Sequence, residues 1–292
     1  MKRIFTPRLL LITSMTVFGT IALFVRSIPL PSGEIALYRA ILAAILIGTY
    51  LLITKQRLPL SKIKKALPLL LLSGIAMGFN WILLFEAYNH TTVSVATLSY
   101  YFAPVIVTAV SPILFHEKLG AKQIICFVMS TLGIVLITGI GDITQGISGF
   151  LGIILGLGAA VLYASVVLIN KFIKEVDGIN RTFLQFVAAI ITLIPYVLLT
   201  NGINLLSLDT KGLICLLIVG IVHTGITYCM YFSSLKELPG QKAAILSYID
   251  PLVAVIISVA VLGESISLPQ IIGGILILGF TLWNEITLKK SK

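Results

Sequence analysis

Charged side chains are scarce in this chain. Asp, Glu, Lys and Arg together make up 11% of its 292 residues, whereas hydrophobic residues make up 58%. Soluble globular domains carry about 25% charged residues, so this chain has too few to cover a surface exposed to water. A soluble protein with a very apolar core would need ten long helices with almost no polar face. The composition therefore excludes an ordinary soluble domain and favours a membrane protein.

Residues that build covalent or metal-dependent sites are also scarce. The three cysteines, Cys126, Cys215 and Cys229, lie in apolar segments, so no disulfide framework is implied. The sequence has no metal-ligand cluster, no glycine-rich phosphate loop and no nucleophile motif, and its connections are mostly short. We therefore expect no catalytic residues, no metal and no other cofactor. Nucleic acid is not an expected partner either, because the net charge of +10 is spread over many loops.

Long apolar runs are what the sequence does contain. Ten runs of about 18 to 24 residues are each long enough for a helix to cross a hydrocarbon core about 30 Å thick. We therefore predict an all-α membrane protein with ten transmembrane helices. The runs cover residues 9–28, 33–53, 66–88, 91–114, 121–139, 149–170, 182–200, 211–232, 241–262 and 269–286.

Lysine and arginine are unevenly distributed between the connections. If both ends of the ten-helix chain lie on one side, 18 of the 21 Lys and Arg residues fall on that side. Arg26 and Lys211 fall on the other side, and Arg39 lies within a span. Loops rich in Lys and Arg stay in the cytoplasm during insertion, so we predict a multi-pass protein of the inner (plasma) membrane with both termini cytoplasmic.

The two halves of the chain share a pattern. When the sequence is compared with itself at a shift of about half its length, identical residues align at four informative positions. They are Tyr101 with Tyr248, Pro104 with Pro251, Glu117 with Glu264, and Gln123 with Gln270. We therefore predict two five-helix repeats, residues 1–140 and 141–292. Because five is odd, the second repeat enters the membrane from the opposite side. Such inverted repeats can open a midplane site to each side in turn, although duplication can also build a mere scaffold.

Three segments resemble a known family. They are Glu34–Ala44 (EIALYRAILAA), Leu114–Ile137 (LFHEKLGAKQIICFVMSTLGIVLI) and Val261–Phe280 (VLGESISLPQIIGGILILGF). They are similar to the EamA-type members of the drug/metabolite transporter superfamily, although His116 and Cys126–Phe127 stand where glycine is common in that family. The resemblance covers essentially the whole chain. It implies a helical basket around a central cavity, in proteins that mostly export amino acids, related metabolites or toxic organic compounds.

We therefore expect a transporter, an exporter of small organic metabolites such as amino acids or amines. Its partners would be the solute, membrane lipid and, where transport is coupled, protons, and it would act as a monomer or homodimer. A flippase for lipid-linked groups is the alternative, and it would need a cavity open to lipid with a basic headgroup site. A membrane-embedded enzyme is disfavoured by the missing catalytic cluster.

The fourth and ninth spans carry candidate cavity residues. Thr97, Tyr101 and Pro104 are spaced four and three residues apart and share one helix face, and Tyr248 and Pro251 repeat the pattern. Tyrosines in membranes are often interfacial anchors, but these two lie too deep for that role. We expect them to line the cavity. Each proline can kink its helix and so act in gating.

Three charged residues lie in or near the spans. Asp250 is near the middle of the ninth span, where it would bind a cationic amine, exchange protons, or cap carbonyl groups freed by Pro251. Arg39 would attract a carboxylate or form a structural ion pair with Glu34 or Glu86. Glu264, at the end of its span, would anchor the helix end in interfacial water.

Four further residues are candidates by depth alone. Asn80 and Trp81 lie in the third span, and His223 and Tyr228 lie in the eighth. A histidine can change protonation near neutral pH, but a lone one is more often a hydrogen-bonded packing residue. We include all four as candidate cavity residues.

Overall fold

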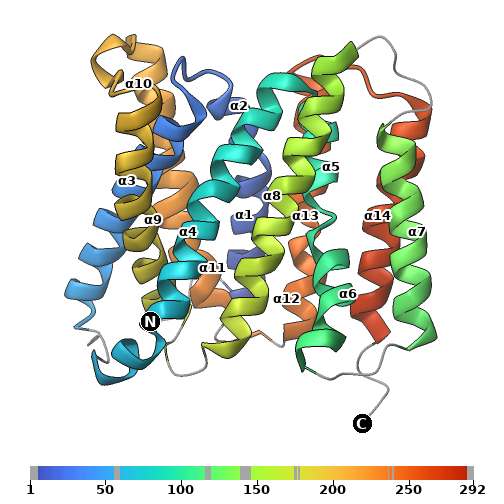
Figure 1. The fold of residues 1–292 in the computed structure, drawn as a ribbon, viewed down its shortest axis with the longest axis horizontal. Helices are drawn as coiled ribbons and strands as arrows, with labels where there is room; N and C mark the ends of the chain where they lie inside the picture. Colours follow the sequence, from blue (N-terminus) through green and yellow to red (C-terminus); the bar gives the residue numbers. More distant parts are fainter. Residues whose placement is uncertain are drawn as a thin grey trace.

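The computed structural model describes residues 6–55, 60–115, 120–138, 146–173, 176, 178–235, 237–238 and 240–287. Within these residues all regular structure is helical, and the long helices run alongside one another in a single bundle (Figure 1). The elements are α1 (Pro7–Gly19), α2 (Ile21–Val25), α3 (Ser32–Ile53), α4 (Leu60–His90), α5 (Val93–Tyr100), α6 (Ala103–Phe115), α7 (Ala121–Thr138), α8 (Gly146–Phe172), α9 (Gly178–Thr200), η2 (Leu205–Ser207), α10 (Thr210–Leu217), η3 (Ile218–Ile226), α11 (Thr227–Leu235), α12 (Gly240–Ser247), α13 (Ile249–Ile256), η4 (Ile257–Val261) and α14 (Leu268–Thr287).

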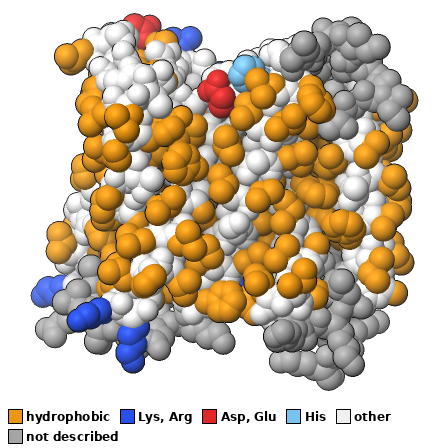
Figure 2. Space-filling view, in the orientation of Figure 1, with side chains coloured by type: hydrophobic (Ala, Val, Ile, Leu, Met, Phe, Trp, Pro, Cys, Tyr) orange, Lys and Arg blue, Asp and Glu red, His pale blue; other side chains and the backbone are white. Residues whose placement is uncertain are grey.

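The outside of the bundle is apolar. Large side chains such as Leu52, Ile113 and Leu199 are exposed on it, and hydrophobic side chains cover most of the visible face between the two ends (Figure 2). Among the described residues, seven helical segments are long and apolar enough to cross a membrane, and three shorter apolar helices cover 121–137, 245–261 and 268–284. An exposed surface of this kind is stable in lipid and costly in water. The structure is that of an all-α membrane protein.

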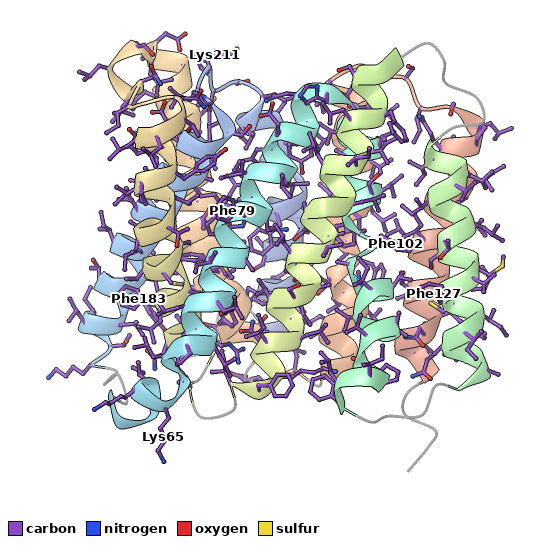
Figure 3. The ribbon with its side chains drawn as sticks, in the orientation of Figure 1. Lys65, Phe79, Phe102, Phe127, Phe183 and Lys211 are labelled. Carbon is purple, nitrogen blue, oxygen red and sulfur yellow. The ribbon has the colours of Figure 1, made fainter. Side chains whose placement is uncertain are left out.

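The two ends of the bundle are marked by charged residues. Lys65 lies at the lower end and Lys211 at the upper end (Figure 3), and most of the Lys and Arg visible in Figure 2 are at the lower edge. We call these ends the Lys65 face and the Lys211 face. The end of α4 at His90 is held to Ser148 of α8 on the Lys211 face, by a 3.2 Å hydrogen bond between His90 Nδ1 and Ser148 Oγ.

Several predicted spans are interrupted rather than continuous. The fourth predicted span consists of α5 and α6, which are separated at Tyr101, and the ninth consists of α12, α13 and η4, with a break at Tyr248. Each break lies three residues before a proline, Pro104 or Pro251. A proline has no N–H to donate to the carbonyl four residues earlier, and its ring collides with that carbonyl. The prolines therefore lie in the first turn of a new helix, where they are tolerated, and not in the middle of a kinked one.

The eighth predicted span contains a different irregularity. Its central nine residues, η3 (Ile218–Ile226), form a π-helix. The hydroxyl of Thr224 donates to the carbonyl of Val219 at 2.8 Å, and that of Thr227 donates to Val222 at 2.7 Å, both five residues back. π-helical turns are rare and occur frequently at functional sites.

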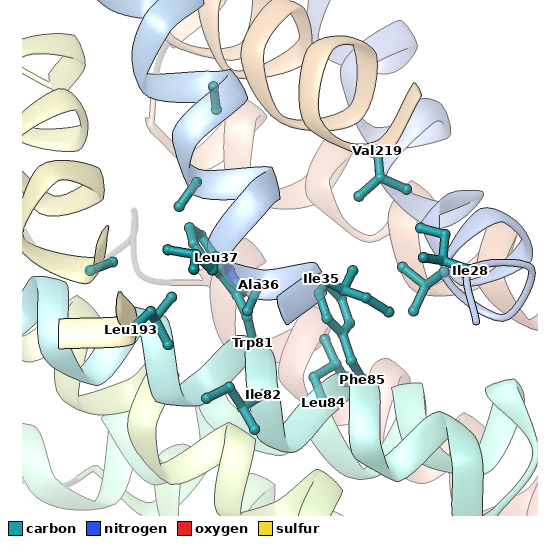
Figure 4. Packing of buried hydrophobic residues seen from close by; sticks show 14 of the residues in the cluster. Ile28, Ile35, Ala36, Leu37, Trp81, Ile82, Leu84, Phe85, Leu193 and Val219 are labelled. Atoms are coloured by element: carbon teal, nitrogen blue, oxygen red, sulfur yellow. The ribbon is translucent and has the colours of Figure 1, made fainter. Parts of the chain in front are cut away.

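The main core lies where α3, α4 and α9 pack together. Its buried side chains include Ile35, Trp81, Phe85 and Leu193 (Figure 4). α7 packs mainly against α14, and this pair lies at one side of the bundle (Figure 1).

Buried polar groups also hold the helices together. Gln185 of α9 donates hydrogen bonds of 2.7 Å to Ser73 of α4 and to Asn170 of α8. Asn80 of α4 donates to the carbonyl of Ala159 of α8 at 2.6 Å. Such bonds stabilise helix pairs in a membrane, where apolar contact with a neighbouring helix offers little gain over contact with lipid.

Candidate functional site

A cavity of about 320 Å³ lies inside the bundle. Helices from both predicted repeats form its wall, from α1 to α13. The lining residues are Met15, Phe18, Gly19, Ile21, Arg39, Trp81, Leu84, Phe85, Tyr88, Thr97, Tyr100, Tyr101, Ala103, Pro104, Tyr163, Tyr228, Tyr231, Ser247, Tyr248, Asp250 and Ala254. A concave site of this size, mostly apolar with a few convergent polar groups, is typical of small-molecule binding.

Tyrosine dominates the lining. Seven of the ten tyrosines in the chain line the cavity. Sequence reasoning selected Tyr101, Tyr228 and Tyr248. It missed the other four, Tyr88, Tyr100, Tyr163 and Tyr231. The first three were selected because they lie deep within an apolar run. The same criterion, applied to every tyrosine, would also have selected Tyr100 and Tyr163.

Asp250 is the acidic residue of the lining. It lies in the first turn of α13, two residues after the break at Tyr248. The phenol of Tyr101, at the break between α5 and α6, donates a 2.5 Å hydrogen bond to its Oδ2 atom. The structure thus shows a side-chain partner for the carboxylate, and the expected capping of carbonyl groups near Pro251 stays a prediction. The two helix breaks thus bring a carboxylate from one half of the chain against a phenol from the other.

Arg39 is the basic residue of the lining, and it is only 5% exposed. Its Nε donates to the hydroxyl of Thr224 in the π-helical segment at 2.7 Å. Its guanidinium carbon lies 4.5 Å from the ring centre of Trp81 and 5.4 Å from that of Phe85. Stacking over aromatic faces stabilises a cation that is removed from water.

The expected ion pair of Arg39 with Glu34 or Glu86 is wrong. Glu34 accepts hydrogen bonds from the backbone N–H and the side-chain amide of Asn204. Glu86 accepts from Ser32 at 2.6 Å and lies 3.3 Å from the His90 ring, near the Lys211 face. Both carboxylates are held at the helix ends, so neither reaches the depth of Arg39.

Three other candidates lie outside the lining. Asn80 is bonded to α8, as described above. His223 is 2% exposed, with its Nε2 3.0 Å from the hydroxyl of Thr20 and its ring packed on Phe24. Pro251 is buried beside Asp250 without facing the cavity. The remaining candidates, Trp81, Thr97, Tyr101, Pro104, Tyr228, Tyr248, Asp250 and Arg39, all lie on its wall.

The two ends of the cavity differ in exposure. Tyr88, two residues before the end of α4 on the Lys211 face, is 4% exposed. Thr97 and Ala254 of the lining are buried too. By contrast, Pro104, Tyr231 and Tyr248, which line the cavity from the half of the bundle toward the Lys65 face (Figure 1), are each partly exposed. The cavity is therefore accessible on the side toward the Lys65 face and sealed near the Lys211 face.

Within the described residues, no three His, Cys, Asp or Glu side chains are grouped so that they could hold a metal ion. The chemistry available to the cavity is therefore that of its carboxylate, guanidinium, hydroxyl groups and aromatic rings. These groups suit the binding of a polar organic solute by charge, hydrogen bonds and stacking.

Comparison with known proteins identifies related chains. The uncharacterized transporter YxxF of Bacillus subtilis (strain 168) is 31% identical over 270 residues, which cover 91% of this chain and 85% of that protein. An uncharacterized transporter of Archaeoglobus fulgidus is 27% identical over 281 residues, which cover 94% of this chain and 95% of that one.

A solved structure and a family profile extend the comparison. A protein crystal structure with 17% sequence identity matches 94% of this chain and 95% of its own length at a TM-score of 0.66, which shows a shared fold. The profile of the EamA-like transporter family matches residues 6–139 and also residues 150–284. The chain therefore belongs to the EamA-like transporter family, and it is a membrane transporter.

Proposed function

We propose that this protein exports small organic metabolites by alternating access, through ten helices arranged as two inverted five-helix repeats. The observation that carries the proposal is the cavity, which has a carboxylate–phenol pair across its middle and is accessible from one side. In this proposal the Lys65 face is cytoplasmic and the structure represents the inward-accessible state. Protons or the solute gradient would drive the reaction.

Two observations support the repeats. The family profile matches two segments that correspond to the two halves of the chain. The helix breaks at Tyr101 and Tyr248 also lie at equivalent positions of those halves, each three residues before a proline. Two similar units of opposite orientation can exchange conformations, which gives each membrane side access to the same site in turn.

The charges of the cavity favour amino acids or amines as substrates. In the described part of the chain, neither Arg39 nor Asp250 forms an ion pair with another side chain. Tyr228 lines the same cavity as both residues. An unpaired charge within a membrane is costly, so a solute that brings the opposite charge binds favourably. An ammonium group would neutralise Asp250, and a carboxylate would neutralise Arg39.

The flippase alternative is less well supported. It needs a basic site for a headgroup, and Arg39, which is the basic residue of the lining, is stacked against Trp81 and Phe85. Arg39 is also only 5% exposed, so it does not form a basic site open to lipid.

Uptake into liposomes tests the function. Purified protein, inserted with and without a pH gradient, is expected to move at least one radiolabelled amino acid, polyamine or aromatic amine faster than empty liposomes do. Arg39→Gln should weaken the uptake of carboxylate-bearing solutes about tenfold or more, because hydrogen bonds to charged groups contribute about 1.5–3 kcal/mol. Uptake of amines that lack a carboxylate should change little.

The exposed Lys211 provides a matched control, and Lys211→Gln should leave uptake unaltered. If Arg39→Gln lowers uptake of both solute classes and the melting temperature together, Arg39 only joins α3 to the π-helical segment. If no solute in the screen is moved at all, the transport proposal for these classes fails.

Cysteine labelling tests the orientation. In a variant without native cysteines, Asn89→Cys near the Lys211 face should react with an impermeant maleimide added to intact cells. Lys62→Cys, in the first turn of α4 at its other end, should react only after the cells are opened, because basic segments remain inside. Labelling of position 62 from outside with position 89 protected would reverse the proposed topology.

A further inference from the structure

A cluster of polar contacts closes the cavity on the Lys211 face. The carboxylate of Glu264, just beyond η4, is ion-paired with the guanidinium of Arg26, which follows α2. It also accepts a 2.8 Å hydrogen bond from the backbone N–H of Val93, the first residue of α5, and a 2.5 Å bond from the hydroxyl of Ser258. We call the side chains of Arg26, Ser258 and Glu264, together with the Val93 N–H, the outer latch.

Arg26 extends the cluster to α4. Its Nη2 donates 2.7 Å hydrogen bonds to the carbonyls of Tyr88 and Thr91, and its Nε donates to Tyr88 at 3.1 Å. These carbonyls lie at the end of α4, where helical partners run out. One guanidinium thus joins the chain after α2, the end of α4 and Glu264.

The backbone around Glu264 is shaped for this contact. Gly263 has φ +67°, a conformation that side chains disfavour. The turn directs the chain back, so that the N–H of Glu264 donates to the carbonyl of Ser258 at 3.0 Å. The Glu264 side chain is only 10% exposed. The expectation that it anchors a helix end in interfacial water is therefore wrong, because its oxygens are bound to protein.

The outer latch lies directly over the sealed end of the cavity. Tyr88 lines the cavity with its side chain and accepts from Arg26 with its carbonyl. Ala254 lines the cavity one helical turn before Ser258. The latch also joins the two halves of the chain, because Arg26 and Val93 belong to the first and Ser258 and Glu264 to the second.

We propose that the outer latch is the outer gate of the transporter, and that the Arg26–Glu264 pair must break before the cavity opens to the Lys211 face. This inference rests on the proposed alternating access. The pair is partly shielded from water. Removing one partner therefore leaves an uncompensated charge near the sealed end of the cavity, which favours the state in which the two halves separate there.

Accessibility of Ala254→Cys to a membrane-impermeant maleimide measures the gate without any knowledge of the substrate. In a background lacking Cys126, Cys215 and Cys229, the buried position 254 should react slowly from outside intact cells. Glu264→Gln keeps the size of the side chain and removes its charge. It should speed labelling about tenfold, the effect of losing one charge-assisted hydrogen bond.

Asp209→Asn is a matched control. Asp209 is also a carboxylate that accepts from a backbone N–H at the start of a helix, here Gly212 at 2.8 Å. Among the residues that the structure describes, it forms no ion pair with the other half. Asn caps helices equally well, so labelling at position 254 should not change. If position 254 is labelled at the same rate in Glu264→Gln as in Asp209→Asn, the latch proposal is overturned.

A cross-link gives a second test that does not depend on the Gln variant folding. Arg26→Cys with Glu264→Cys, bridged through two disulfide bonds by a short bis-methanethiosulfonate reagent, should stop labelling at position 254 and stop uptake. A reductant cleaves the disulfide bonds and, once it is removed, labelling and uptake should both return. Unchanged labelling after bridging contradicts the gate. If bridging slows labelling but the protein moves no solute even before bridging, the result supports the gate and contradicts the proposed transport.

Discussion

Asp250→Asn is expected to abolish concentrative uptake while the protein stays folded. Asn is nearly isosteric with Asp and can still accept the hydrogen bond from Tyr101, so the contact between the two helix breaks is kept. What disappears is the charge that binds an ammonium group or carries a coupling proton. Charge-assisted hydrogen bonds contribute about 1.5–3 kcal/mol, which corresponds to a loss of affinity of about ten- to a hundredfold.

Paired measurements separate the function of Asp250 from its structural role. Melting in detergent should be similar for Asp250→Asn and the parent protein, while uptake into liposomes is lost across the pH range. Asp250→Leu, which also removes the acceptor for Tyr101, should lower the melting temperature as well, because a buried hydroxyl loses its partner. Full pH-dependent uptake by the Asn variant would remove Asp250 from the mechanism.

The depth of a polar residue within an apolar run predicted part of the cavity wall. Asp250, Tyr101 and Tyr248 were selected because a polar group in the middle of an apolar run must face protein or water. The same reasoning selected Asn80 and His223, which satisfy that requirement by bonding to neighbouring helices. Depth alone cannot separate a cavity from a polar contact between helices, because both remove the group from lipid.

The all-helical membrane architecture could be predicted from the apolar runs, but the interruptions of the helices could not. The prolines were expected to kink continuous helices, whereas each starts a new helix after a break at a tyrosine. The π-helix around His223 and the outer latch had no signal in the sequence. They depend on contacts such as that of Arg26 with Glu264, between residues far apart in the chain. A local pattern does not encode such pairs.

Gly19→Ala should destabilise the protein and impair uptake. A Cβ atom on Gly19, at the end of α1, would lie 2.6 Å from the carbonyl oxygen of Asp250 and 2.7 Å from the Cβ of Val253. These are backbone and rigid β-branched neighbours, so α1 would have to move away from α13. Overpacking of this kind costs about 1–3 kcal/mol. Because Gly19 and Asp250 both line the cavity, the displacement should also disturb solute binding.

Gly279→Ala in α14 is the matched control, since a Cβ atom there meets nothing within 4 Å. Alanine is the better helix former by about 1 kcal/mol, so this variant should melt at the same temperature as the parent or slightly higher. Both variants are measured by thermal melting in detergent and by uptake into liposomes. If Gly19→Ala has the same melting temperature and the same uptake as Gly279→Ala, then α1 can move away from Asp250 without cost. The close approach of α1 to α13 would then have no part in holding the carboxylate at the cavity wall.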